Sequence, residues 1–307
     1  MIPAIQSEQL AEVRIGVNPI GWSNDDLPWL GADVPLDLIL RESAVIGYEG
    51  IELNGKFPRD PAQLSRVLST HGLALVSGWY SGGLARRTVE DEIAAIGPHL
   101  SLLVANGATT LIYGETADSI QGEHRPLIER PFFRASDAWH DYADNLTTLA
   151  RYTLEHGVRL AYHHHMGAYV QSPADIDILM ATTGEEVGLL LDTGHCFLGG
   201  GDPVTLLHNH IHRICHVHCK DVRAAVAELA RNQCWSFPDY ILNGAFTVPG
   251  DGDLDFPVIV SALLAGGYRG WLVVEAEQDP AVAPSERYAR KGFETLRALL
   301  ERESTAQ

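Results

Sequence analysis

The sequence predicts an α/β protein folded as a single (β/α)8 TIM barrel, on two observations. From Arg14 onward, eight short apolar runs alternate with longer segments of helical period, which is typical of βα units and a parallel sheet. The middles of the runs are apolar and their C-terminal ends are polar, as expected where helices cover the strands and the strand ends line a catalytic mouth. A doubly wound open sheet is the alternative, but eight units and carboxylates at the end of the last strand favour a closed barrel.

The expected strands are short, and each leaves room for a helix before the next. They cover residues 14–18, 50–53, 73–78, 109–114, 159–164, 187–192, 213–218 and 271–277. An Asp or Ser beside a proline suits the cap and first turn of a helix, and predicts helix starts at residues 33–35, 60–61, 172–173 and 202–203. Glycines suited to a left-handed C-cap predict five helix ends, at Gly47, Gly72, Gly107, Gly157 and Gly267.

Two connections are longer than a barrel requires, which predicts lids or binding loops. They span residues 115–135 and 221–254, and the second contains a helix-like stretch at 222–231. No linker rich in Pro, Gly or Ser divides the chain. We therefore expect one domain over residues 1–307, with a short N-terminal extension at 1–13 and a loop insertion at 221–254.

Composition places this chain of 307 residues among ordinary soluble globular proteins, with 46% hydrophobic and 20% charged residues. A formal net charge of −18, without a cluster of basic residues, disfavours a nucleic-acid partner. The sequence has no apolar stretch of membrane-spanning length, and its N-terminus carries acidic residues where a secretory signal would be positive. We expect a cytoplasmic protein without a membrane partner, whose four cysteines are reduced thiols.

Polar side chains gather at the expected strand ends, which a barrel brings to one mouth. They are Glu52, Glu115, His163, His164, His165, Asp192, His195, His216, His218, Lys220, Glu275 and Glu277. Because side chains alternate along a strand, His216 and His218 share a face, as do Glu275 and Glu277. Histidine and carboxylate ligands without cysteine suit a divalent ion such as Mn, Co, Zn, Fe or Mg. The candidate metal ligands are His163, Asp192, His218 and Glu275.

Each of these residues also has a structural interpretation. A single histidine at a strand end is more often hydrogen-bonded in the core than bound to a metal, so the joint occurrence on four strands is what favours a metal centre. The rings of His163, His164 and His165 cannot all face the same way, and His164 is the one expected to be structural. Asp192 opens the motif Asp-Thr-Gly-His, which also suits a simple turn, but an unpaired carboxylate at the end of an apolar strand would be costly and favours function.

Seven segments, in order along nearly the whole chain, carry a resemblance to known proteins. They are IGVNPIGWSNDD (15–26), YEGIELNGKFP (48–58), YHHHMGAYVQSP (162–173), LLLDTGHC (189–196), HVHCKDVR (216–223), FTVPGDGDLDF (246–256) and VVEAEQDP (273–280). Together they resemble the sugar isomerase and epimerase-like barrels, a superfamily that also includes endonuclease IV, and within it the myo-inosose-2 dehydratases. The resemblance implies a xylose isomerase-like TIM barrel that uses a divalent ion, Mn or Co, and takes a cyclic polyol ketone as its substrate.

In that superfamily Glu, Asp, His and Glu from strands five to eight typically hold the metal, which implies Asp192, His218 and Glu275 as ligands here. The fifth-strand position departs from the pattern, because His163 stands where Glu is typical. Either the centre is less anionic, or His165 or a water molecule supplies that ligand. The implied activity is that of a hydro-lyase in inositol catabolism, which removes water from 2-keto-myo-inositol (inosose) to give a trihydroxycyclohexane-dione.

That dehydration takes a proton from the carbon next to the ketone and expels a hydroxyl group. A metal serves it as a Lewis acid on the ketone oxygen. A base near neutrality is needed, for which His195, His163 or Glu277 could serve, while Lys220 or a histidine could act as the acid or stabilise the enolate. The residues assigned to catalysis are His195, Lys220 and Glu277.

Contacts to the substrate are assigned to Trp22, Glu52 and His165. Glu52 suits the hydroxyl groups of a polyol, since carboxylates accept hydrogen bonds from them. Trp22, like Trp79 and Tyr80, either forms the apolar wall of a sugar-like site or packs in the core.

Other functions remain open on this scaffold. A metal-dependent ketose epimerase or isomerase shares the enolate chemistry, although the long segment 221–254 and the three consecutive histidines favour the dehydratase. An endonuclease-like repair protein needs a basic groove, which the charge of −18 disfavours. A sugar-binding barrel without catalysis would bind its ligand without metal. A homo-oligomer is expected from the base rate for such barrels.

Overall fold

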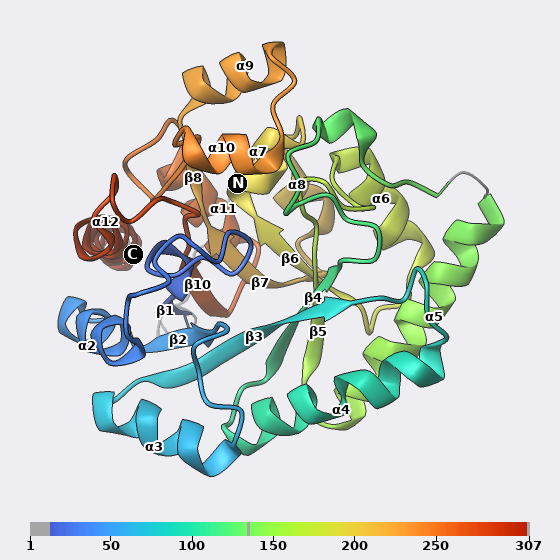
Figure 1. Cartoon of the computed structure of the whole chain (residues 1–307), viewed down its shortest axis with the longest axis horizontal. Helices are drawn as coiled ribbons and strands as arrows, with labels where there is room; N and C mark the ends of the chain where they lie inside the picture. The colour runs from blue at the N-terminus through green and yellow to red at the C-terminus, as the bar shows by residue number, and fades with distance from the viewer. Residues whose placement is uncertain (1–12, 134–135, 306–307) are drawn as a thin grey trace.

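The computed structural model describes residues 13–133 and 136–305, which form the predicted closed barrel (Figure 1). Its strands hydrogen-bond around the ring in the order β1-β10-β7-β6-β5-β4-β3-β2, and every barrel pair is parallel. They are β1 (Val13–Val17), β2 (Gly50–Leu53), β3 (Ala74–Gly82), β4 (Thr110–Glu115), β5 (Arg159–His163), β6 (Gly188–Asp192), β7 (Ile214–Cys219) and β10 (Gly270–Val274). The predicted fold class is confirmed, and the expected extension 1–13 lies outside the described residues except for Val13.

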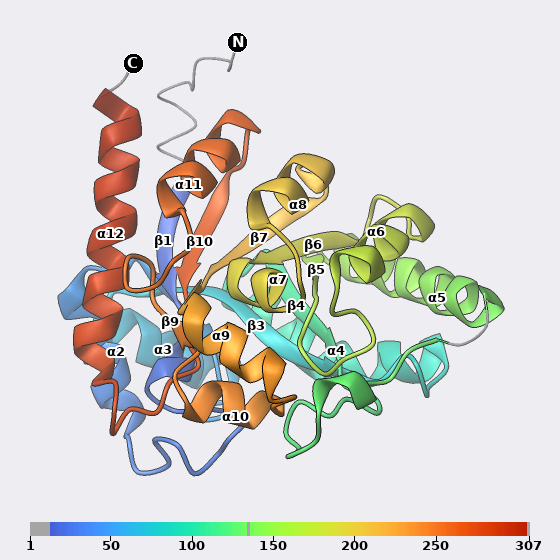
Figure 2. The same ribbon diagram turned by 90° about the horizontal axis from the view of Figure 1, so that it is seen from above.

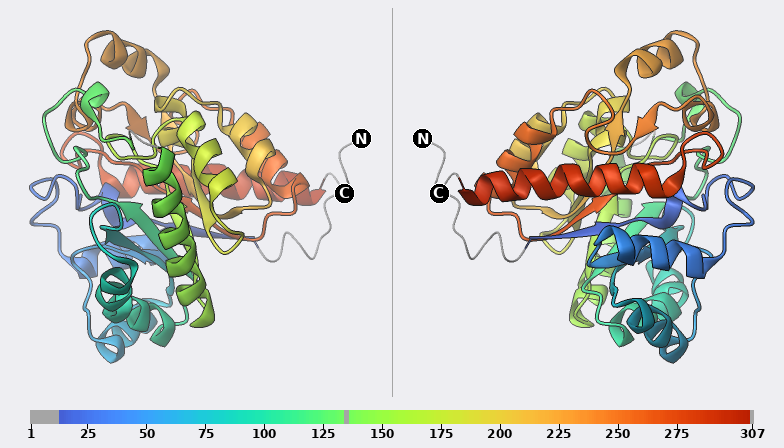
Figure 3. Two further views of the ribbon diagram at one scale, coloured as in Figure 1. Left: turned by 90° about the vertical axis from the view of Figure 1, so that its right-hand side faces the viewer. Right: turned by 90° about the vertical axis from the view of Figure 1, so that its left-hand side faces the viewer.

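Helices follow the strands and surround the barrel, and the long helix α12 lies along its side (Figures 1 and 3). They are α2 (Leu36–Ile46), α3 (Pro61–His71), α4 (Val89–Ala105), α5 (Ser136–Glu155), α6 (Pro173–Thr182), α7 (Thr193–Leu198), α8 (Pro203–His210), α11 (Phe256–Ala265) and α12 (Ser285–Thr305), with short 3-10 turns η1 (Pro19–Gly21) and η2 (Leu127–Glu129). Among the described residues, no helix is both long and apolar enough to cross a membrane.

Most of the expected helix signals are confirmed. The side chains of Asp60, Ser172 and Asp202 cap α3, α6 and α8 by accepting backbone N–H groups. The cap expected at residues 33–35 is wrong, because α2 has Pro35 at its N-cap and no side-chain hydrogen bond caps it. Asp33 lies two residues too early to reach those N–H groups. All five glycines predicted to end helices have positive φ angles.

The long connection after β7 forms a small subdomain over the barrel mouth. It contains β8 (Asp221–Val222), α9 (Ala224–Asn232), α10 (Phe237–Leu242) and β9 (Phe246–Thr247), and β8 pairs antiparallel with β9. Figure 2 shows α9 and α10 together at one end of the barrel strands. The expected helix at 222–231 corresponds to α9, whereas α10 and the strand pair were not predicted. Phe237 and Phe246 are buried in a hydrophobic cluster that joins this insertion to the barrel.

Besides that cluster, the described residues form two further hydrophobic clusters. The larger cluster lies between strands and helices, and a small cluster of Ile112, Ala161 and Leu190 with Trp79 lies within the barrel. Because the strand middles mostly bury apolar side chains on both faces, most polar residues of the barrel lie toward the strand ends, although Ser77 and His216 lie within β3 and β7. The barrel thereby gathers side chains from several strands at one mouth.

Candidate active site

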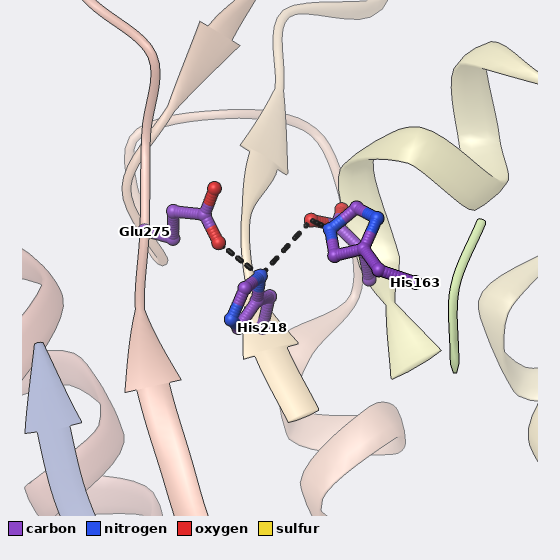
Figure 4. Close-up of side chains that lie close together, drawn as sticks. His163, His218 and Glu275 are labelled. Carbon is purple, nitrogen blue, oxygen red and sulfur yellow. Dashed lines mark ion pairs between the residues drawn. The ribbon is translucent and has the colours of Figure 1, made fainter. Parts of the chain in front are cut away.

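The four expected metal ligands come together at this mouth. His163 ends β5, Asp192 ends β6, His218 lies near the end of β7 and Glu275 directly follows β10. The β6–β7 register places Asp192 opposite His218. One ligand atom from each residue lies within 4.8 Å of the others, and all four side chains are buried. Figure 4 shows Glu275 and His218 facing each other, with His163 across the same space. We call these four residues the metal-ligand group.

The metal-ligand group is arranged to attract a cation. Nδ1 of His218 makes an ion pair with Glu275 and lies 3.6 Å from Oδ2 of Asp192, which is 3.4 Å from Nε2 of His163. Apart from these ion-pair contacts, Nδ1 of His218, Oδ2 of Asp192 and Oε2 of Glu275 are buried and have no hydrogen-bond partner among the described residues. Buried polar atoms left in this way commonly indicate an ion that belongs between them.

Electrostatics at the metal-ligand group point the same way. Burial opposes the charged form of His218, but Glu275 and Glu52 raise its pKa well above the usual value. Burial also opposes the charge of Asp192, yet Lys220 and His195 hold the pKa of that carboxyl well below its usual range. Carboxylates that favour a proton on a histidine nitrogen also favour a metal ion at the same nitrogen, and binding the metal releases the proton.

Glu52 lies behind the metal-ligand group rather than in the pocket. It is 1% exposed, and its carboxylate lies 3.2 Å from Nε2 of His218 and 2.7 Å from Nε2 of His216. It also accepts hydrogen bonds from Ser77 (2.6 Å) and Asn18 (2.7 Å). The expected contact of Glu52 with substrate hydroxyls is therefore corrected. Four donors occupy the carboxylate, which orients His218 so that Nδ1 faces the metal-ligand group.

A buried lysine connects the metal-ligand group to a further carboxylate. Nζ of Lys220 lies 3.2 Å from Asp192, 3.2 Å from Glu275 and 2.7 Å from Oε2 of Glu277. These three carboxylates raise the pKa of Lys220 although burial opposes its charge. Gly194 makes room for the lysine, since a Cβ there would lie 2.7 Å from Cγ of Lys220. Lys220 therefore neutralises part of the buried negative charge.

His195 contacts Oε1 of Glu277, the carboxylate oxygen that Lys220 does not contact. Its Nε2 lies 3.4 Å from Oε1 of Glu277, and its Nδ1 accepts the backbone N–H of Met166 at 3.3 Å. Burial, then the neighbouring Lys220, lowers the pKa of His195 well below its usual value. The ring is therefore neutral, and because Nδ1 accepts a hydrogen bond, the proton is on Nε2 and faces Glu277.

The other two histidines of the run differ in their surroundings. Nε2 of His164 accepts the backbone N–H of Asp192 at 3.4 Å, and burial lowers the pKa of His164 to about 3. The ring of His164 is structural, as predicted. The ring of His165 is tilted by 41° against that of His195, with ring centroids 4.0 Å apart. His165 also contacts Phe237 and donates from Nδ1 to the backbone oxygen of Met166 at 2.8 Å.

A pocket opens above these residues, with about 530 Å³ of space when the adjoining open solvent is included. It is lined by Asn18, Ile20, Asp25, Asp26, Leu53, Asn54, Trp79, Ile112, His163, His165, His218, Glu275 and Glu277. Of the expected site residues, Asp192, His195 and Lys220 lie beneath this lining. Trp22 does not line the pocket, since its side chain is buried in the main core and donates from Nε1 to Glu42 at 2.6 Å.

The structure adds residues that sequence reasoning did not assign. Asp25, Asp26 and Asn54 line the pocket from the loops after β1 and β2. The only signal in the sequence was the acidic pair that closes the segment at residues 15–26. Glu115, in contrast, ends a strand as expected but points elsewhere, because it accepts hydrogen bonds from Tyr113 and from the N–H groups of residues 85 and 117.

Comparison with known proteins places this geometry in a family. Residues 40–299 match the family described as the xylose isomerase-like TIM barrel. The rhizopine catabolism protein MocC of Rhizobium meliloti is 50% identical over 96% of this chain and 90% of its own. The inosose dehydratase of Geobacillus thermodenitrificans is 41% identical over 93% of this chain and 97% of its own.

Among solved structures, the IOLI protein with a binding zinc atom superimposes with a TM-score of 0.70 at 16% identity, over 94% of this chain and 99% of that one. The probable 3-DHS dehydratase AsbF of Bacillus anthracis gives a TM-score of 0.68 at 13% identity, over 92% and 98%. These likenesses support the barrel fold, and the sequence relatives define the group more narrowly. The chain therefore belongs to the xylose isomerase-like TIM-barrel family and, within it, to the family of the inosose dehydratases.

Proposed function

We propose that this protein is a metal-dependent hydro-lyase that removes water from 2-keto-myo-inositol to give a trihydroxycyclohexane-dione in inositol catabolism. One observation carries the proposal: three of the four metal-ligand residues and a separate carboxylate, Glu277, line one pocket, in a chain 41% identical to an inosose dehydratase over nearly its whole length. An enolate-forming dehydration needs these two elements, an electrophile at the ketone and a base beside it.

His163, Asp192, His218 and Glu275 would hold the metal, for which we propose Mn or Co. Two imidazoles and two carboxylates balance the charge of a divalent ion, and the three buried atoms described above, which lack hydrogen-bond partners, fit such a ligand set. His163 takes the place of a more usual glutamate, so the centre carries one negative charge less. When bound, a divalent ion polarises the ketone and stabilises the enolate as a Lewis acid.

Glu277 is our candidate for the base that takes the proton next to the ketone. It lines the pocket and is not part of the metal-ligand group. His195 is a weaker candidate, because its Nδ1 already accepts the N–H of Met166 and its Nε2 faces Glu277. His163 is a weaker candidate because it belongs to the metal-ligand group. Asp25 and Asp26 also line the pocket, but they come from the loop after β1, whereas Glu277 lies two residues after the ligand Glu275.

Lys220 and His195 act as positioning residues for Glu277. They approach different oxygens of its carboxylate, Lys220 at 2.7 Å from Oε2 and His195 at 3.4 Å from Oε1, which restrains its rotation. Once Glu277 has taken the proton, the same carboxylic acid can donate it to the departing hydroxyl group, so one residue serves both steps. His165 lies beside it in the pocket wall and remains a candidate for contact with the substrate.

The identity of the product tests this function against its nearest rival. Incubation with 2-keto-myo-inositol should give a product lighter by one water, with new ultraviolet absorbance from the diketone or its enol. An epimerase or isomerase would instead give a product of unchanged mass, and a sugar-binding barrel would give none. Glu277→Gln should lower kcat by about 100- to 10,000-fold, the usual contribution of a general base, while leaving metal binding unchanged.

A further inference from the structure

The loop between β1 and α2 brings a carboxylate into the pocket that neither the metal-ligand group nor Glu277 accounts for. Asp26 lines the same pocket as Glu277 and His218. Its position is fixed, because Oδ1 of the buried Asn24 accepts the backbone N–H groups of both Asp26 and Leu27 at 2.8 Å. Leu27 is fully buried in the cluster that joins the insertion to the barrel. Asp26 is therefore presented by rigid backbone.

One oxygen of Asp26 is held by the loop that follows β4. Nε2 of Gln121 donates to Oδ1 of Asp26 at 2.8 Å, across 95 residues of sequence. The amide of Gln121 is itself oriented, because its Oε1 accepts the hydroxyl group of Ser119 at 2.9 Å. Ile120, between these two residues, is buried and donates its N–H to the oxygen of Gly167. Contacts from two loops of the mouth thus restrain the carboxylate of Asp26.

The second oxygen of Asp26 distinguishes it from the other polar residues of this part of the lining. Both carboxylate oxygens of Asp25 accept the backbone N–H of Gly55, at 2.9 and 3.3 Å. The side-chain oxygen of Asn18 accepts a backbone N–H, and its amide nitrogen donates to Glu52. Asn54 likewise uses both polar atoms on backbone groups. Within the described residues, Oδ2 of Asp26 has no hydrogen-bond donor, so it is available to a ligand in the pocket.

We propose that Asp26 determines specificity by accepting hydrogen bonds from substrate hydroxyl groups on ring carbons remote from the ketone. This inference rests on the proposed function. A cyclic polyol bound through its ketone at the metal-ligand group presents its remaining hydroxyl groups to the rest of the pocket. A fixed carboxylate accepts from such donors, and burying it without them would be costly, so a substrate that lacks the hydroxyl group is rejected.

The charge state of Asp26 suits this role. Burial raises the pKa of Asp26 to about 6, and the hydrogen bond from Gln121 opposes the rise. At the neutral pH of a cytoplasm the carboxylate is therefore mainly ionised, which is the form that accepts hydrogen bonds with both oxygens.

Asp26→Asn tests the inference, because it keeps the shape and the oxygen facing Gln121 while replacing the available acceptor by a donor. We expect kcat/KM for 2-keto-myo-inositol to fall by about 10- to 100-fold, the usual effect of losing a hydrogen bond to a charged group. In a set of deoxy analogues that each lack one hydroxyl group, the analogue without the hydroxyl group that contacts Asp26 should react almost equally with the wild-type enzyme and with Asp26→Asn. The dissociation constant for Mn, measured by equilibrium dialysis, should stay unchanged.

Asp33→Asn is the matched control, since it removes the same charge from an exposed position of the same loop and should change kcat/KM by less than about threefold. A uniform loss for the substrate and every analogue, or no loss, would overturn the inference while the proposed function stands. If analogues do not turn over, the same comparison is made on their dissociation constants by calorimetry. A wild-type protein that does not dehydrate inosose at all would instead reject the proposed function.

Discussion

The contact between Glu52 and His218 predicts the outcome of one informative substitution, Glu52→Gln. The wild-type carboxylate receives four donors, from His218, His216, Ser77 and Asn18. A glutamine offers a single acceptor oxygen, and its amide N–H groups would face donors. Loss of a partner that orients a metal-bound histidine typically weakens metal binding by about 10- to 100-fold, or about 1.4 to 2.7 kcal/mol. We expect a rise of that size in the dissociation constant for Mn.

The measurement is equilibrium dialysis with Mn, monitored by electron paramagnetic resonance, together with urea denaturation to verify folding. Glu115→Gln is a matched control. Glu115 is also a buried carboxylate at a strand end, but its hydrogen bonds go to Tyr113 and to backbone N–H groups outside the pocket. It should leave Mn binding unchanged. Equal affinity in folded Glu52→Gln and wild-type protein, or an equal loss in Glu115→Gln, would refute the positioning role of Glu52.

Three further predictions follow from the charges at the mouth. Lys220→Met leaves three buried carboxylates without their cation. The metal-free variant should therefore lose about 3 to 5 kcal/mol of unfolding free energy in a urea titration, and the Mn-bound variant should lose less. Equal losses with and without Mn would contradict this prediction. Mn at about 100 times its dissociation constant should stabilise the wild-type protein by about 2.7 kcal/mol, a gain that a chelator removes, and a thermal scan insensitive to Mn would count against a metal site. The ratio of wild-type to Asp26→Asn kcat/KM should be greatest above pH 6 and fall as the pH drops below it, because the pKa of Asp26 is about 6 and protonation removes the acceptor. Besides burial, the groups that influence this pKa are Gln121, Asp25, Glu277 and Lys220. A ratio that stays constant with pH would exclude the effect.

The barrel and the metal-ligand group could be predicted from sequence because both depend on local pattern. Apolar runs that end in polar residues specify buried strands with functional C-terminal ends, and the fold then brings His163, Asp192, His218 and Glu275 together without knowledge of the connecting loops. Gly194 makes room for the side chain of Lys220, and this contact can be recognised only in the three-dimensional structure.

The remainder of the site depends on contacts between distant parts of the chain. Glu52 meets His218 across 166 residues and Gln121 meets Asp26 across 95, so no local pattern reveals either pair. Alternation along a strand cannot tell whether a strand-end carboxylate faces a substrate or a histidine, which is why Glu52 was misplaced. Trp22 follows a 3-10 turn that directs its ring into the core, and sequence alone left that orientation open.

The most direct test of the account is product analysis after adding 2-keto-myo-inositol to protein stripped of metal by a chelator, with and without Mn or Co. The account predicts no turnover by the stripped protein. It also predicts a product lighter by one water once about one ion per chain is bound, and no recovery in Asp192→Asn, which lacks a ligand. Dehydration by fully stripped protein, or a product of unchanged mass in the presence of metal, would contradict it.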